Sequence, residues 1–133
     1  MDRLPDQPEG FEAGVAFDDE SLPLWVRIEE ALHMVGVAQR EAKGRGVTMA
    51  QVTAEYYSAK AGETMALYEK GYPATLIANL IKGQPETNRL LERKLAEEVG
   101  YKNAVEATNV YKLIARVLND EEEREYEQAR RTV

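Results

Sequence analysis

The fold of this chain is decided by residues 86–130, a stretch of 45 residues that reads ETNRLLERKLAEEVGYKNAVEATNVYKLIARVLNDEEEREYEQAR. It contains no proline and a single glycine, Gly100, so nothing in it stops a helix outright. Apolar residues recur in it at spacings of three and four, which is the period of one helix face. The stretch therefore predicts one long helix, roughly 65 Å in length if it is continuous.

The residues before this stretch predict three shorter helices separated by glycine and proline. The predicted helices lie at about 22–43, 48–70, 74–82 and 86–128. Gly71 is suited to the position just after a helix, whereas Pro73 and Pro85 are suited to helix first turns. Gly44 and Gly46 mark either a turn or a weak point in a continuous helix. Thr48, with Gln51 three residues later, resembles a capping box and favours a new helix start.

The sequence predicts an all-α fold, because no segment alternates apolar and polar residues as a strand would. The glycines and prolines at 71–85 predict a corner in the chain, centred near residue 78. Segments of similar length flank this corner, which predicts a long antiparallel helical hairpin with a short corner helix. Residues equidistant from the corner should then meet, so we expect Met65 near Leu91, Tyr57 near Val99 and Val47 near Tyr111. The apolar face of the second predicted helix is too wide for one neighbour. We therefore expect a homo-oligomer, a dimer or larger, that completes a helical bundle.

Residues 1–20 carry seven acids, one base, two prolines and two glycines, which predicts an acidic, disordered arm before a single helical domain over 21–133. The formal net charge of the chain is −7. Residues 120–133 add to the acidity of the arm, whereas residues 21–119 carry 13 bases and 11 acids. The acidity thus belongs to the ends, and the helical body is nearly neutral.

The composition argues against several kinds of active site. The chain has no cysteine, which removes thiolate nucleophiles and thiolate metal ligands. Glu30 and His33 have the Glu-x-x-His spacing of di-iron bundles, but such sites need a second copy and the chain has no second histidine. No phosphate-binding glycine motif occurs. We therefore expect no enzyme activity, no catalytic residues, no metal and no cofactor. No apolar run is long enough to span a bilayer, so a cytoplasmic location without membrane binding is expected.

Direct nucleic-acid binding is the main alternative to a purely protein-binding role. Residues 63–83 can be aligned with a degenerate helix-turn-helix in which Gly71 is the turn glycine, although Leu67 stands where that motif needs a small residue. A basic helix surface is the other possibility, formed by Arg89, Arg93, Lys94, Lys102, Lys112 and Arg116. A further alternative is an inhibitor of a host protein whose acidic ends mimic nucleic acid.

The region 50–119 resembles small, largely uncharacterised α-helical early proteins of temperate phages and prophages of Gram-positive bacteria. The resemblance is carried by Leu67–Gly83, by the run that begins at Arg93, by Tyr101–Val110 and by Tyr111–Arg116. It implies an association with DNA replication or recombination in a bacterial host cell, but it assigns no reaction and no catalytic residue.

These observations predict a non-enzymatic, oligomeric helical adaptor or accessory protein that acts through protein contacts of the coiled-coil type. The apolar corner is the expected partner-binding patch, formed by Leu76, Ile77, Leu80 and Ile81.

Overall fold

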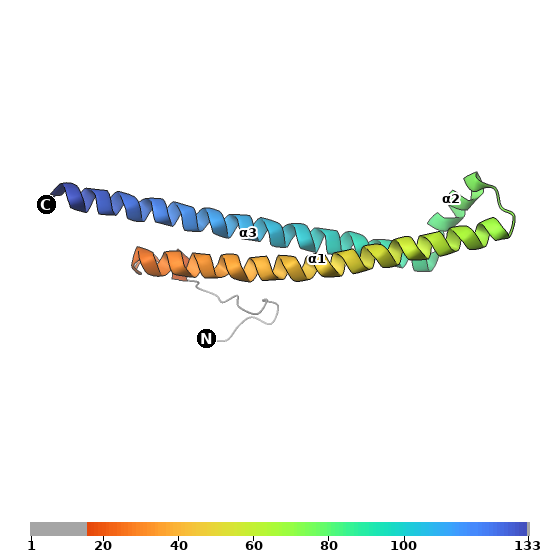
Figure 1. Cartoon of the computed structure of the whole chain (residues 1–133), viewed down its shortest axis with the longest axis horizontal. Coiled ribbons are helices and arrows are strands. Elements are labelled where there is room, and N and C mark those ends of the chain that lie inside the picture. Colours follow the sequence, from red (N-terminus) through yellow and green to blue (C-terminus); the bar gives the residue numbers. More distant parts are fainter. Residues whose placement is uncertain (1–15, 133) are drawn as a thin grey trace. The chain divides into compact units, whose positions relative to one another are not determined.

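The computed structural model describes residues 16–132, and all of its regular structure is helical (Figure 1). A short 3₁₀ helix, η1 (Ala16–Asp18), precedes three α-helices: α1 (Leu24–Glu69), α2 (Ala74–Lys82) and α3 (Pro85–Thr132). The all-α class expected from the sequence is confirmed for the described residues. None of these helices is both long and apolar enough to cross a lipid bilayer.

The end of α1 is set by the glycine that the sequence predicts for it. Gly71 has a φ of 89°, in the left-handed region that favours glycine. Its N–H donates to the carbonyl of Tyr68 at 3.0 Å, and the N–H of Tyr72 donates to the carbonyl of Leu67 at 3.3 Å. These two bonds form a Schellman motif that satisfies the last carbonyls of the helix. The next helix, α2, has the predicted range 74–82.

Of the two alternatives at Gly44–Gly46, a turn is wrong and a continuous helix is observed, because α1 is one helix of 46 residues. Thr48 Oγ1 donates to the carbonyl of Gly44 at 3.2 Å, four residues back along the helix, so its side chain does not cap a new start. A Cβ at Gly46 would lie 3.3 Å from the ring of Tyr101. The missing side chain lets this ring pack closely on α1, which helps to offset the roughly 1 kcal/mol that each glycine costs inside a helix.

Replacing Gly44 by alanine should stabilise α1. A Cβ at Gly44 meets nothing within 4 Å, so the substitution adds helix propensity without a clash. We expect the free energy of unfolding to rise by about 0.8–1 kcal/mol, measured by urea denaturation followed by circular dichroism. Gly71→Ala is the matched control, because its positive φ should make the same change destabilising by about 1–2 kcal/mol. A loss of stability in Gly44→Ala would contradict a continuous helix at this point.

The chain divides into two compact units. Unit 1 comprises Met1–Glu41 and Ala104–Val133, and unit 2 comprises Ala42–Asn103. Each of the two long helices contributes a segment to both units, because helices of this length contact only what lies beside them.

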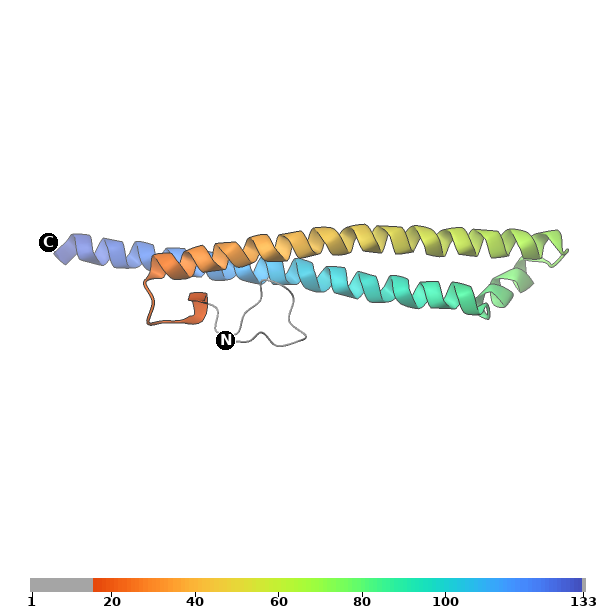
Figure 2. The same cartoon turned by 90° about the horizontal axis from the view of Figure 1, so that it is seen from below.

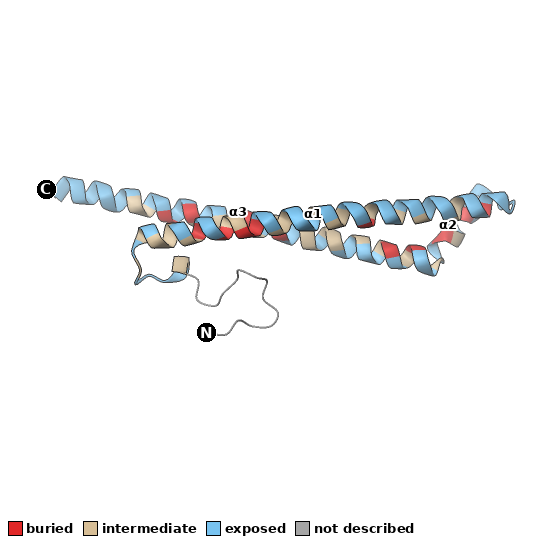
Figure 3. Ribbon diagram, turned by 60° about the horizontal axis from the view of Figure 1, so that its bottom comes forward, coloured by how far each residue is buried: buried red, intermediate tan, exposed pale blue. Residues whose placement is uncertain are grey.

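In unit 1, the first turns of α1 lie beside the later turns of α3 (Figures 1 and 2). Buried residues gather where these segments face each other (Figure 3). The core cluster contains Ala31, Ala115 and Leu118, with Phe17, Leu24, Ile28 and Ile114 packed against it. Small alanines in this cluster let the two helix backbones approach closely.

The acidic arm expected over residues 1–20 is in part docked on unit 1. Residues 1–15, including Phe11 and Val15, lie outside the described residues, but η1 and the turn after it are ordered on the helices. The ring of Phe17 stacks edge-on against Tyr111, with the ring centroids 5.9 Å apart. Arg27 Nε donates to the carbonyl of Phe17 at 3.0 Å. This aromatic contact and this hydrogen bond hold the last residues of the predicted arm.

In unit 2, α1 and α3 run in opposite directions, but not in the expected register. Tyr101 meets Gly46, and Arg93 pairs with Glu55 at 3.5 Å between Nη1 and Oε2. A corner centred at residue 78 would instead have placed Tyr101 opposite Glu55. The helix α2 packs beside the last turns of α1, so α3 begins further back along α1 and the pairing shifts by eight or nine residues.

The shifted register leaves the expected apolar pairs apart. Met65, Tyr57, Val47 and Val99 each keep more than half of their surface exposed. The predicted contacts of Met65 with Leu91 and of Tyr57 with Val99 are therefore not formed.

Candidate protein interaction surface

A continuous row of apolar side chains lies uncovered on α1 in the described part of unit 2. Its members are exposed and follow each other at spacings of three or four residues. We call this row the α1 stripe; it consists of Val47, Ala50, Ala54, Tyr57, Ala61, Met65 and Tyr68. Its four large members retain between 54% and 68% of their surface. Contiguous exposed apolar rows of this length mark interaction sites in soluble proteins.

The α1 stripe lies away from the face of α1 that forms the unit 2 core. Val52 has no exposed surface, and it stands five residues after Val47 and five before Tyr57. Residues five positions apart lie about 140° apart around the helix axis. The segment of α1 in unit 2 therefore has two apolar faces, of which only one is covered within the unit.

Tyr57 in the stripe is held in place by α3. Lys94 Nζ lies 5.9 Å from the centre of the Tyr57 ring and 6.0 Å from that of Tyr56, and the two rings are 5.1 Å apart. Lys94 Nζ also donates to Glu98 Oε1 at 2.7 Å, and this hydrogen bond is the main cause of its raised pKa. The charged ammonium is attracted to both rings. A tyrosine restrained in this way loses less side-chain entropy when a partner covers it.

The corner patch predicted from the sequence is only partly a surface. Ile77 and Ile81 are 5% and 7% exposed and pack with Leu67 of α1, while Leu80 is half-buried against the same cluster. Only Leu76, 41% exposed, remains open. The expected partner-binding patch is thus mainly core, because α2 turns its apolar face onto the end of α1.

Three of the six bases predicted for nucleic-acid binding are engaged with carboxylates. The pairs are Arg89 with Glu86 at 2.7 Å, Arg93 with Glu55 at 3.5 Å and Lys94 with Glu98 at 2.7 Å. The hydrogen bond from Arg89 lowers the pKa of Glu86. These carboxylates offset much of the positive charge that the three bases would offer to a phosphate backbone.

The other three predicted bases are exposed and form no ion pair with a described residue. They are Lys102 in unit 2 and Lys112 and Arg116 in unit 1. Lys112 and Arg116 stand four residues apart and so share one side of α3.

The predicted helix-turn-helix region, 63–83, contains two helices, but it offers few polar side chains that could bind base edges. Leu67 fills the space where this motif needs a small residue, since it is buried against Ile77 and Ile81. The exposed polar residues of α2 are Thr75, Asn79 and Lys82. A reading helix usually offers more hydrogen-bonding groups than these.

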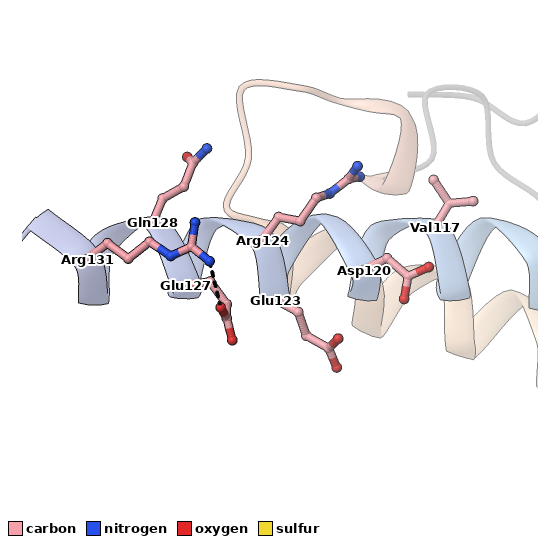
Figure 4. A pocket seen from close by; sticks show the side chains of 7 residues that line it. All are labelled: Val117, Asp120, Glu123, Arg124, Glu127, Gln128 and Arg131. Carbon is pink, nitrogen blue, oxygen red and sulfur yellow. Dashed lines mark ion pairs between the residues drawn. The ribbon is translucent and has the colours of Figure 1, made fainter.

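The last turns of α3 carry a shallow depression with charged walls (Figure 4). All of its lining residues come from α3: Val117, Asp120, Glu123, Arg124, Glu127, Gln128 and Arg131. Arg131 and Glu127 form an ion pair at 3.9 Å. A depression lined by one helix does not enclose a small molecule, and ligand sites are normally concave and mostly apolar. Within residues 16–132, no three His, Asp or Glu side chains gather as a metal site would need.

Sequence reasoning found part of the α1 stripe but not its role. The sequence predicts a wide apolar face on this part of α1, but the expected pairing assigned Tyr57 and Met65 to contacts with α3. Val47 and Ala50 extend the same spacing of three and four towards the N-terminus of α1. This spacing of three and four is the period of a row that one helix can follow.

Comparison of the chain with protein-family models, curated proteins and solved structures found no match.

Proposed function

We propose that this chain is a non-enzymatic helical adaptor that assembles through the α1 stripe. The observation that carries the proposal is the row of seven exposed apolar residues on a helix whose other apolar face is already buried. Burying apolar surface is worth about 25 cal/mol per Å². A folded unit that leaves such a row in water therefore gains free energy by covering it with another chain.

Two further parts of the proposal come from the sequence. The first is the long antiparallel hairpin, completed to a bundle by oligomerisation, which is supported by the opposite directions of α1 and α3 in unit 2. The resemblance to small early proteins of temperate phages supports a role beside DNA replication or recombination. Ion pairing of Arg89, Arg93 and Lys94 favours an adaptor over direct nucleic-acid binding.

Placing a carboxylate in the middle of the stripe should dissociate the assembly. Ala54 is exposed and glutamate is a good helix former, so Ala54→Glu should leave the monomer folded. An unpaired charge buried in the interface costs about 3–5 kcal/mol, which corresponds to a rise in Kd of at least about a hundredfold. Analytical ultracentrifugation over a range of concentrations measures this change, with circular dichroism as the check of folding.

Ala96→Glu is the matched control, because Ala96 is also an exposed alanine of unit 2 but lies on α3. It should assemble like the unaltered chain. A chain that sediments as a monomer at every concentration would rule out assembly with itself. Equal effects of the two substitutions would show that the α1 stripe is not the interface.

A further inference from the structure

We propose that the partner covering the α1 stripe is the α1 stripe of a second copy, running in the opposite direction. This inference rests on the proposed function and adds to it the identity and the orientation of the partner. Three features of the stripe carry it: its repeat, the sizes of its side chains and the charges around it.

Six of the seven stripe residues recur at an interval of seven residues, which is the period of helices that wrap around each other; Met65 is the exception, because Thr64 holds the corresponding place. Val47, Ala54, Ala61 and Tyr68 form one series at that interval, and Ala50 and Tyr57 belong to a second series three residues later. In a coiled coil these two series are the core positions. The row covers 22 residues, or roughly 33 Å of helix, so another helix can follow it for three repeats.

The side-chain sizes favour an antiparallel pair. If a two-fold axis crosses at the level of Glu55 and Tyr56, the layers pair Ala54 with Tyr57, Ala50 with Ala61 and Val47 with Thr64. Each tyrosine at the centre then faces an alanine, so no layer has to hold two tyrosines. A parallel pair would stack Tyr57 on Tyr57 and Ala61 on Ala61, which leaves wide and narrow layers that no single helix spacing fills.

The charges around the stripe favour the same orientation. Lys43 stands one helical turn before the stripe and Glu69 directly after it, and both are exposed. An antiparallel pair brings Lys43 of one copy to the end where Glu69 of the other lies, and it places Lys60 beside Thr53. A parallel pair would set Lys43 against Lys43 and Glu69 against Glu69, and like charges at this distance repel.

The exposed area of the stripe is a large part of what pairing requires. Tyr57 and Tyr68 are 55% and 68% exposed. Taking about 200 Å² for a whole tyrosine, these two side chains offer roughly 250 Å² per copy. Val47, Met65 and the three alanines add to this, so the stripe supplies a large part of the about 800 Å² per partner found in stable dimers.

Disulfide crosslinking tests the orientation, because the chain contains no cysteine of its own. Ala50→Cys and Ala61→Cys are each introduced into a full-length chain, and the two chains carry tags of different size. The two variants are then mixed and oxidised at a concentration at which the protein assembles. In the antiparallel pair the introduced thiols at positions 50 and 61 face each other, whereas two copies of position 61 are roughly 16 Å apart along the axis. A disulfide needs Cα atoms within about 7 Å, so the mixed product should exceed either homodimer at least about tenfold.

Each outcome has a definite meaning. A mixed disulfide between the two variants is the expected result, with no product above background from Ala96→Cys on α3. A homodimer of Ala61→Cys as the main product would show a parallel pair and overturn the inference, while the proposed assembly would stand. An assembled sample that forms no stripe disulfide would place the interface elsewhere. A monomeric sample would overturn the proposed function as well.

Discussion

Replacing Val52 by aspartate is expected to unfold unit 2 or to lower the free energy of unfolding of the protein by about 4 kcal/mol or more. Val52 has no exposed surface, so an aspartate side chain at this position would have to be buried. Small domains are stable by only about 5–15 kcal/mol, so this loss is a large part of the total. Thermal and urea denaturation followed by circular dichroism measure the change.

Val99→Asp is the matched control, because Val99 is the same residue type, lies in unit 2 and is 59% exposed. It should change the free energy of unfolding by no more than about 0.5 kcal/mol. If both substitutions cost the same, the face of α1 that contains Val52 would not be the buried one. The assignment of the α1 stripe as the uncovered face of the helix would then be wrong.

The sequence was sufficient for the helices whose ends depend on local chemistry. Gly71 ends α1 because its left-handed conformation is a property of glycine itself, and α2 has the predicted bounds. Gly44 and Gly46 are glycines as well, but unlike Gly71 they do not end the helix, because α1 continues through them. At Gly46 the helix is supported by Tyr101, which packs on it from 55 residues away in the chain. Local sequence does not reveal such a contact.

The register of α1 and α3 depends on the position of α2, which a symmetric corner does not take into account. Equal segment lengths predict that residues equidistant from residue 78 meet, but α2 lies against Leu67 and shifts α3 along α1. The corner was predicted as the partner-binding patch because its residues are apolar, and their packing on Leu67 cannot be read from the sequence. Once Ile77 and Ile81 are covered by Leu67, the row of exposed apolar residues on α1, which includes Tyr57 and Met65, becomes the better candidate.

The corner gives the second large expected effect, because its apolar residues were predicted to be surface and two of them are core. Ile77→Asp should lower the free energy of unfolding by about 3–5 kcal/mol, since it places a carboxylate in the cluster with Leu67 and Ile81. Leu76 is the neighbouring residue, of similar volume and 41% exposed. Leu76→Asp should cost no more than about 1 kcal/mol. Urea denaturation of both variants, at a concentration that keeps the chain in one assembly state, compares the two values.

The two variants also decide between the corner and the α1 stripe as the site of assembly. A folded Leu76→Asp chain should sediment like the unaltered protein, because Leu76 is outside the stripe. A folded Leu76→Asp chain that no longer assembles would move the interface to the corner. An Ile77→Asp chain as stable as the unaltered one would mean that α2 is not anchored on α1. The shifted register of α1 and α3 in unit 2 would then have no cause, because the packing of α2 on Leu67 is what displaces α3 along α1.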